Sequence, residues 1–335
     1  MVRVTASAPG KVTLFGEHAI VYGFPAIVTA IDRRVYVTAT ARSDRAVRIK
    51  ALDLRVPGVV VTYTPEEVVI ETDHDRTLSA IAYLKKAVEV ASRYIGVWRG
   101  VNIEVRSSMP VGAGLGTSAA VSVATIAAYS AAVEADLSRE EIARLGWEVE
   151  KAVQGIASPM DTSIATFGGF IKIWAEGGGE FVRRELKVGS EMPFVIGYVE
   201  REAGTKDLVR AVRDLKRRYP DLVNAIMEAI GRVTKEAEEA LARGDLRRVG
   251  ELMNLNHGLL EALGVSNKKL SEMVYAARSA GALGAKLTGA GGGGCAIALT
   301  PEAQDRVEVA MRLYASITMK ARFGAPGVEV RVHRA

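Results

Sequence analysis

The chain has 335 residues, of which 49% are hydrophobic and 25% are charged, an ordinary balance for a soluble globular protein. Single cores stop growing near about 250–300 residues, so this length predicts two domains. The net charge of +5 is mildly basic, but the Lys and Arg residues are scattered without interleaved aromatics, which argues against nucleic-acid binding. One cysteine, Cys295, excludes an internal disulfide and fits a reducing cytoplasm.

The first part of the chain predicts strands joined to helices. Residues 34–40 and 101–105 alternate with a period near two, as strands do, and residues 77–92 between them are helical in pattern. Residues 107–133 carry no charge, which is long enough for a membrane span. The helical part, 118–133, is built from Ala, Ser, Thr and Val, so we predict a buried helix and no membrane partner. The start of the chain lacks the apolar core of a signal peptide, and we expect a cytoplasmic protein.

The next helix has a clear start. Ser138 and Glu141 form a capping box before an apolar stripe that begins at Ile142 and leaves Glu150 to one side. A polar, Gly-rich stretch at 175–180 then predicts a domain boundary or a long hairpin.

The second half mixes strands and helices as the first half does, which predicts an α+β or α/β architecture. We divide the chain into domains 1–178 and 179–335. The elements expected after the division are strands at 194–199, 294–299 and 328–332, amphipathic helices between about 207 and 280, and a helix from about 301.

A Gly-rich turn leads directly into the uncharged helix, an arrangement in which backbone N–H groups can cradle phosphate. Gly112, Gly114 and Gly116 recur at every second position. This spacing is neither the Gly-x-Gly-x-x-Gly dinucleotide fingerprint nor a Walker A loop, because no Gly-Lys-Ser/Thr follows. The hydroxyls of Thr117 and Ser118 could serve a phosphate or a Mg²⁺ ion, or could simply cap the helix.

Three charged residues and a second glycine run are further candidates. Lys11, in a turn-rich stretch, suits a phosphate or a developing alkoxide, or it is a surface lysine. Asp161 could accept a proton from a substrate hydroxyl or could act as a helix N-cap, and Glu150 could be a second carboxylate for Mg²⁺ or a solvated residue. The run 289–294 requires unusual backbone angles and close packing, for which a ligand is the usual reason.

Taken together and in this order, segments 8–23, 110–120 and 286–295 resemble the small-molecule kinase family that includes galactokinases, homoserine kinases, mevalonate kinases and phosphomevalonate kinases. The resemblance covers nearly the whole chain. Segments 8–23 and 258–266 resemble the mevalonate kinase branch of that family, in its short archaeal form. Galactokinases usually carry Arg where Lys11 stands.

The resemblance implies an α+β fold: an N-terminal ribosomal protein S5 domain 2-like α/β domain, a C-terminal ferredoxin-like domain, and an active site in the cleft between them. It implies ATP-dependent phosphorylation of mevalonate at its 5-hydroxyl, with Mg²⁺, in isoprenoid biosynthesis. Relatives are commonly dimers, so a homodimer is compatible with the resemblance. The alternatives are a sibling kinase acting on the mevalonate 3-hydroxyl, phosphomevalonate or a sugar, and a non-catalytic ATP and ligand sensor.

The resemblance also implies residue roles. Asp161 would be the catalytic base, or would only orient the hydroxyl while Lys11 stabilises the transferring charge. Ser118 and Glu150 would hold Mg²⁺. The remaining expected contacts are Gly112, Ala113, Gly114, Leu115, Gly116, Thr117, Ser118, Gly291 and Gly292 with ATP, and Glu17, His18 and Thr205 with mevalonate.

Overall fold

The computed structural model describes residues 2–51, 59–63, 68–71, 78–109, 113–155, 157–176 and 181–333. The chain forms two compact units, and each is assembled from separate stretches of sequence. Unit 1 comprises Met1–Lys11, Asp32–Gly168 and Pro326–Ala335, and unit 2 comprises Val12–Ile31 and Gly169–Ala325. The single division after residue 178 that we drew from the sequence stays a prediction.

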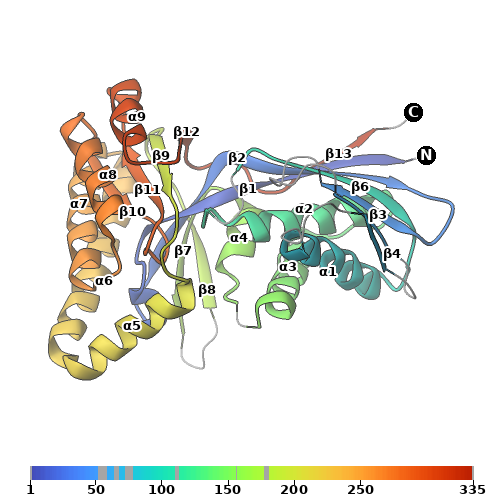
Figure 1. Cartoon of the computed structure of the whole chain (residues 1–335), viewed down its shortest axis with the longest axis horizontal. Coiled ribbons are helices and arrows are strands. Elements are labelled where there is room, and N and C mark those ends of the chain that lie inside the picture. Colours follow the sequence, from blue (N-terminus) through green and yellow to red (C-terminus); the bar gives the residue numbers. More distant parts are fainter. Residues whose placement is uncertain are drawn as a thin grey trace. The chain divides into compact units, whose positions relative to one another are not determined.

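Unit 1 is a twisted sheet with helices along one face (Figure 1). Its elements are β1 (Arg3–Phe15), β2 (Ala26–Ala41), β3 (Val47–Ala51), β4 (Val59–Tyr63), β5 (Val68–Glu71), α1 (Leu78–Ile95), β6 (Val101–Ser107), α2 (Thr117–Ala132), α3 (Arg139–Gln154), α4 (Met160–Phe167) and β13 (Glu329–His333). The strand order is β13-β1-β2-β6-β3-β4-β5, and β3 pairs with β6 in parallel. The last strand therefore lies beside the first, with Ala6 opposite Val330.

Helix α2 is the buried centre of unit 1, as its uncharged sequence predicted. It packs against α1, α3 and α4, and nearly all its side chains are shielded from water. Small Ala and Ser side chains allow neighbouring helices to approach from several sides. Within the described part of the chain, no helix is both long enough and apolar enough to cross a membrane.

Helices α3 and α4 begin differently. The capping box at α3 is confirmed, since Ser138 accepts a hydrogen bond from Glu141 N and the Glu141 side chain accepts one from Ser138 N. Helix α4 has Pro159 at its N-cap, and Asp161 lies inside the first turn. The reading of Asp161 as an N-cap is therefore wrong, and its carboxylate is available for other contacts.

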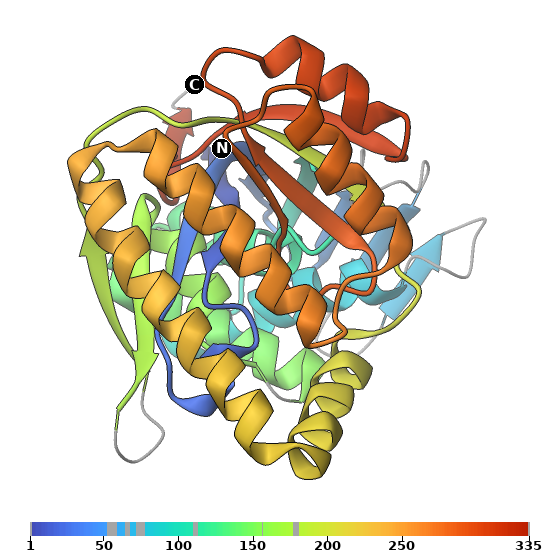
Figure 2. The same ribbon diagram turned by 90° about the vertical axis from the view of Figure 1, so that its left-hand side faces the viewer.

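Unit 2 contains an antiparallel sheet with strand order β10-β11-β9-β12. Its elements are a short 3₁₀ turn, η1 (Ala19–Tyr22), then β7 (Phe170–Ala175), β8 (Phe181–Leu186), β9 (Pro193–Val199), α5 (Thr205–Arg218), α6 (Pro220–Arg243), α7 (Leu246–Ala262), α8 (Lys268–Ser279), β10 (Gly284–Leu287), β11 (Gly294–Leu299), α9 (Gln304–Arg312) and β12 (Ile317–Arg322). Strand, helices, two strands, helix and strand follow one another in the ferredoxin-like order. Helices α7 and α8 lie against β10 (Figure 2).

Two local features of unit 2 follow from the sequence. Ala175 pairs with Phe181 at the end of the antiparallel β7–β8 ladder, and residues 177–180 lie outside the described residues. Gly197 on β9 has no side chain because a Cβ there would lie 2.5 Å from the Met273 sulfur and 2.9 Å from Met311 Cε. The two methionines fill the core between the sheet and helices α8 and α9.

Candidate active site

A largely buried ion pair in unit 1 joins Lys11 on β1 to Asp161 on α4. Lys11 Nζ lies 3.1 Å from Asp161 Oδ1, and Lys11 is only 7% exposed. No described residue makes a hydrogen bond to that carboxylate oxygen, so the contact is an ion pair with spare acceptor capacity. A half-shielded carboxylate beside a fixed ammonium can take or orient a hydroxyl proton.

The lysine is held against the N-terminus of α2. The Lys11 backbone N–H donates to Leu115 O at 2.8 Å, and a Cβ on Gly116 would lie 2.7 Å from Lys11 Cγ. Gly116 has φ +70° and is the N-cap of α2, which has no side-chain cap. The first-turn N–H groups of α2 thus lie close to a buried cation, a combination that suits phosphate.

Glu150 on α3 is a buried carboxylate, which overturns the reading of it as solvated surface. It is 4% exposed, and Gln154 Nε2 donates to its Oε2 at 3.0 Å. Burial, followed by the negative charge of Asp161, raises the pKa of Glu150 to about 7, although Ser118, Lys11 and Gln154 oppose this. The other oxygen, Oε1, is buried and has no hydrogen-bond partner within the described residues.

These oxygens fit a magnesium ion. Glu150 Oε1 is an acceptor that burial has deprived of water, and the charges of Glu150 and Asp161 are close enough to repel one another. A divalent cation would coordinate the unpaired oxygen and reduce the repulsion between the two carboxylates. Mg²⁺ is commonly held by one or two carboxylates and substrate phosphates. The described residues contain no cluster of three or more His, Cys, Asp or Glu side chains placed to hold a metal.

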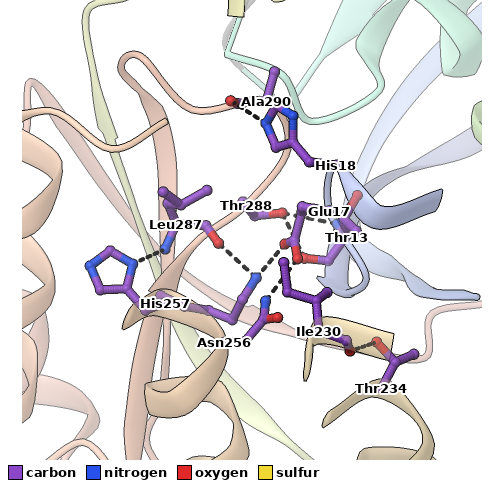
Figure 3. Close-up of polar contacts among 11 residues, drawn as sticks. Thr13, Glu17, His18, Ile230, Thr234, Asn256, His257, Leu287, Thr288 and Ala290 are labelled. Carbon is purple, nitrogen blue, oxygen red and sulfur yellow. Dashed lines mark hydrogen bonds and ion pairs between the residues drawn. The ribbon is translucent and has the colours of Figure 1, made fainter. Parts of the chain in front are cut away.

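Unit 2 carries the residues expected near the acceptor substrate. We call residues 16–24, which connect β1 to β2, the strap. His18 in the strap has φ +60°, a conformation rare for residues other than glycine. Its Nε2 lies 2.9 Å from Ala290 O (Figure 3). A carbonyl oxygen only accepts, so Nε2 carries the proton of this hydrogen bond.

The ionisation state of His18 determines whether its other ring nitrogen, Nδ1, accepts or donates a hydrogen bond. Burial lowers the pKa of His18, while the hydrogen bond to Ala290 and the charge of Glu17 oppose this. The ring is therefore mainly neutral at pH 7, with its proton on Nε2. Nδ1 is then an acceptor for a hydroxyl group.

Glu17 is embedded in a polar network. Lys286 on β10 makes an ion pair with Glu17 Oε1. Asn256 on α7 donates to Glu17 Oε2 at 3.0 Å (Figure 3). Lys286 and Glu17 are both almost completely buried. Burial lowers the pKa of Lys286, and the Glu17 carboxylate opposes this. Because both of its oxygens have protein partners, Glu17 is suited to holding the strap in place.

The glycine run before β11 packs against the protein's own backbone. A Cβ on Gly291 would lie 2.0 Å from Val265 O, and one on Gly293 would lie 2.4 Å from Glu200 O. Gly292 N donates to Val265 O at 2.8 Å. The close packing expected there is present, but these neighbours explain it without a ligand. The contact of Gly291 and Gly292 with ATP stays a prediction.

The remaining predicted residues fall as follows. Thr205 is the first residue of α5, is exposed, and accepts a hydrogen bond from Arg201 at 3.2 Å. Gly112 lies outside the described residues. Unit 1 thus brings together Lys11, Asp161, Glu150 and the segment 113–118, and unit 2 brings together Glu17, His18 and the 289–294 run.

Sequence reasoning missed the partners of these residues. Lys286 and Asn256 fix Glu17, and Gln154 fixes Glu150. Burial, followed by the charge of Glu150, raises the pKa of Tyr83 on α1, so this tyrosine belongs to the surroundings of the same carboxylate. Only Lys286 left a signal in the sequence, as a lone charge in the otherwise apolar strand Gly284–Leu287.

Comparisons with family models match three parts of the chain. Residues 82–169 match the GHMP kinases N terminal domain, and residues 237–316 match the GHMP kinases C terminal domain. Residues 2–41 also match the galactokinase galactose-binding signature.

Similar proteins cover nearly the full chain. The chain is 45% identical to mevalonate kinase of Pyrococcus horikoshii over 332 residues, which cover 98% of this chain and 97% of the relative. It is 35% identical to mevalonate kinase of Saccharolobus solfataricus over 325 residues, covering 97% and 98%.

Solved structures give the same result. L. major mevalonate kinase in complex with R-mevalonate superposes with a TM-score of 0.82 at 26% identity, covering 96% of this chain and 95% of that one. Methanococcus jannaschii mevalonate kinase has a TM-score of 0.79 at 28% identity, covering 95% and 97%. The chain therefore belongs to the GHMP kinase family, and it shares nearly its full length with archaeal mevalonate kinases of that family.

Proposed function

We propose that this protein transfers the γ-phosphate of ATP to the 5-hydroxyl of mevalonate, giving 5-phosphomevalonate and ADP. The observation that carries the proposal is the ion pair between Lys11 and Asp161 beside the uncapped start of α2. Similarity to archaeal mevalonate kinases along almost the whole chain supports mevalonate as the acceptor.

The chemistry assigned to the ion pair follows from what phosphoryl transfer needs. Such transfers depend mainly on positioning and on stabilising charge. The Asp161 carboxylate accepts the hydrogen bond, and then the proton, of the attacking hydroxyl. The Lys11 ammonium favours the developing negative charge on that oxygen and on the transferring group. Lys11 reaches this position because Gly116 leaves room for its stem.

For the nucleotide, we assign the phosphates to the start of α2, with Ala113 to Ser118 as the lining. Gly114 and Gly116 have φ +81° and +70°, which lets the backbone turn its N–H groups toward an anion. Gly291 and Gly292 are assigned to the same nucleotide. The role of Gly112 stays a prediction from the sequence.

For the metal, we assign Mg²⁺ to Glu150 and Ser118. Glu150 offers an unpartnered buried oxygen, and Ser118, in the first turn of α2, acts to lower the pKa of that carboxylate. When bound, Mg²⁺ neutralises charge on the phosphate oxygens. Gln154 orients the carboxylate by donating to its other oxygen.

For the acceptor, we assign His18 and Thr205 to direct contact with mevalonate. The unprotonated Nδ1 of His18 can accept a hydrogen bond from a substrate hydroxyl, and the Thr205 hydroxyl can donate one. Glu17 contributes by holding the strap, since Lys286 and Asn256 occupy both its oxygens. A homodimer and a cytoplasmic location stay predictions.

A sugar is the second candidate acceptor, because residues 2–41 match the galactokinase galactose-binding signature. The two candidates are separated by kcat/KM for mevalonate, galactose, homoserine and phosphomevalonate, measured as ADP release with Mg²⁺ and ATP. The proposal predicts that mevalonate exceeds every other acceptor by at least about 10³-fold, as expected when buried polar groups match one substrate. Preferential turnover of galactose or phosphomevalonate would contradict it and leave the family unchanged.

A further inference from the structure

Lys286 is a fully buried cation that the chemistry described so far does not use. It lies in β10, and 0% of its side chain is exposed. Its ammonium pairs with Glu17 and donates to Leu287 O at 2.7 Å. A lysine so enclosed has no route to a bound substrate, so any effect it has must pass through its partners.

The Lys286 and Asn256 contacts hold the strap beside His18, the residue with the rarest backbone conformation described in the strap. Lys286 and Asn256 take one oxygen each of Glu17, which directly precedes His18. His18 has φ +60° and ψ −37°, far from the regions that side chains favour. Such a conformation persists only where the surroundings fix it on both sides. On one side the restraint is Glu17, and on the other it is the His18 hydrogen bond to Ala290.

The frame behind Lys286 is itself fixed. Leu287 N donates to His257 Nδ1 at 3.3 Å, which ties the end of β10 to α7. Thr288 exchanges two hydrogen bonds with the Thr13 backbone, at 2.9 and 2.8 Å, which ties the next residue to the strand that leads into the strap (Figure 3). Lys286 therefore connects a rigid sheet edge to the strap.

We propose that Lys286 is a positioning residue for the acceptor substrate: by holding Glu17, it fixes the backbone of His18 and so aims the His18 ring. Naming that acceptor mevalonate rests on the proposed function, whereas the effect on His18 does not. Lys286 makes no contact with the reacting atoms.

Replacing Lys286 alone would not separate its effect on the position of His18 from the effect of leaving a buried charge unpaired. Removing Lys286 alone leaves the Glu17 carboxylate buried without a counter-charge, which destabilises the fold for reasons unrelated to the substrate. The informative variant is therefore E17Q/K286M, in which both charges are removed and similar volumes are kept. K286M is measured beside it to separate the two effects.

The matched control is Lys172→Met. Lys172 on β7 makes an ion pair with Glu238 on α6 at 2.7 Å, partly buried and in the same unit. Loss of this pair changes internal charge without touching the strap. The control is expected to keep wild-type kinetics.

The experiment measures the melting temperature and the KM values for mevalonate and ATP in each variant. The proposal predicts that E17Q/K286M melts close to wild type, and that its KM for mevalonate rises about 3- to 10-fold, the scale of one lost hydrogen bond to the substrate. Its KM for ATP should stay within about twofold, since no ATP contact is assigned to the strap. Recovery of the wild-type mevalonate KM in the double variant, or an equal change in K172M, would overturn the proposal.

A spectroscopic readout separates this proposal from the choice of substrate. In protein labelled with ¹⁵N-histidine, the His18 ring should show a hydrogen-bonded Nε2–H in wild type and in K172M, and lose it in E17Q/K286M. An unchanged His18 signal would overturn the proposal even if mevalonate proved to be the wrong acceptor. If neither Lys286 variant folds, Glu17→Gln alone, which removes the charge that Lys286 holds and keeps the side-chain size, must still alter the His18 signal.

Discussion

Lys11 Nζ and Asp161 Oδ1 lie 3.1 Å apart, joining the first strand of the chain to the first turn of α4. The Lys11 side chain packs directly against Gly116, because its stem occupies the space that a side chain at Gly116 would fill. Cation, carboxylate and helix start are thereby fixed relative to one another inside unit 1. This arrangement is what makes the site suitable for phosphoryl transfer.

Replacing either charge of the pair should reduce turnover far more than binding. If Asp161 is the base, Asp161→Asn lowers kcat by about 10²- to 10⁴-fold, the usual contribution of general-base catalysis. If Asp161 only orients the hydroxyl, the amide oxygen still accepts the hydrogen bond and the loss is below about tenfold. Pre-steady-state kinetics with ATP and mevalonate distinguish these results, and an Asp161→Asn variant with wild-type kcat would refute both roles.

Gly116→Ala should displace the Lys11 side chain while leaving that residue's chemistry unchanged. The new Cβ would meet the Lys11 stem at 2.7 Å, and φ +70° is strained for alanine. Gly96→Ala is the matched control, because Gly96 has φ +78° but open space around it. Both variants should lose about 1–2 kcal/mol of stability, whereas only Gly116→Ala should also lower kcat. Equal kcat values in the two variants would count against Lys11 as a catalytic group.

The ionised Glu150 carboxylate should destabilise the folded, metal-free protein at alkaline pH. Its pKa is raised from 4.5 to about 7, so the folded state holds this proton more tightly than the unfolded state. Stability is therefore full below pH 4.5 and is lost as pH rises through 7. At pH 8, Glu150→Gln should be more stable than wild type by up to about 3 kcal/mol, and at pH 4.5 the difference should vanish.

Thermal unfolding at both pH values measures this difference, with Glu148→Gln, a partly exposed carboxylate on the same helix, as the control. Adding Mg²⁺ at pH 8 should raise the melting temperature of wild type but not of Glu150→Gln. Equal stabilisation of wild type and Glu150→Gln by Mg²⁺ would contradict the assignment of Glu150 as a metal ligand.

Mevalonate binding should weaken in acid because of His18. The pKa of His18 lies below its ordinary value of 6.5, so its Nδ1 accepts a hydrogen bond at neutral pH and becomes a donor as pH falls further. The KM for mevalonate should rise by up to about tenfold per pH unit below that pKa. In His18→Phe the KM should be raised about 3- to 10-fold at pH 7.5 and lose this pH dependence. His333→Gln, at the exposed C-terminal strand, should retain it.

The features that the sequence predicted correctly are local ones. The capping box at Ser138 and Glu141 and the uncharged helix α2 each follow from a few neighbouring residues. The interactions that form these features join residues within one or two helical turns, so residue spacing in the sequence is sufficient to predict them. The ordered glycine motifs added the family resemblance, which the comparisons bear out.

What the sequence did not reveal depends on contacts between distant segments. Nothing near Glu17 indicates that Lys286, 269 residues away, neutralises it. Glu150 reads as a surface residue because its own helix is amphipathic, yet α1 and α2 cover it. The C-terminal strand pairs with the first strand of unit 1, a connection that no local pattern records.

The most direct test is the phosphorus and proton NMR spectrum of the product formed from mevalonate, ATP and Mg²⁺ by the wild-type protein and by Asp161→Asn. The proposed function predicts phosphate on the 5-oxygen, made by wild type and, with Asp161 as the base, nearly absent with the variant. Phosphate on the 3-oxygen, or no product from mevalonate while another small alcohol is phosphorylated, would contradict it.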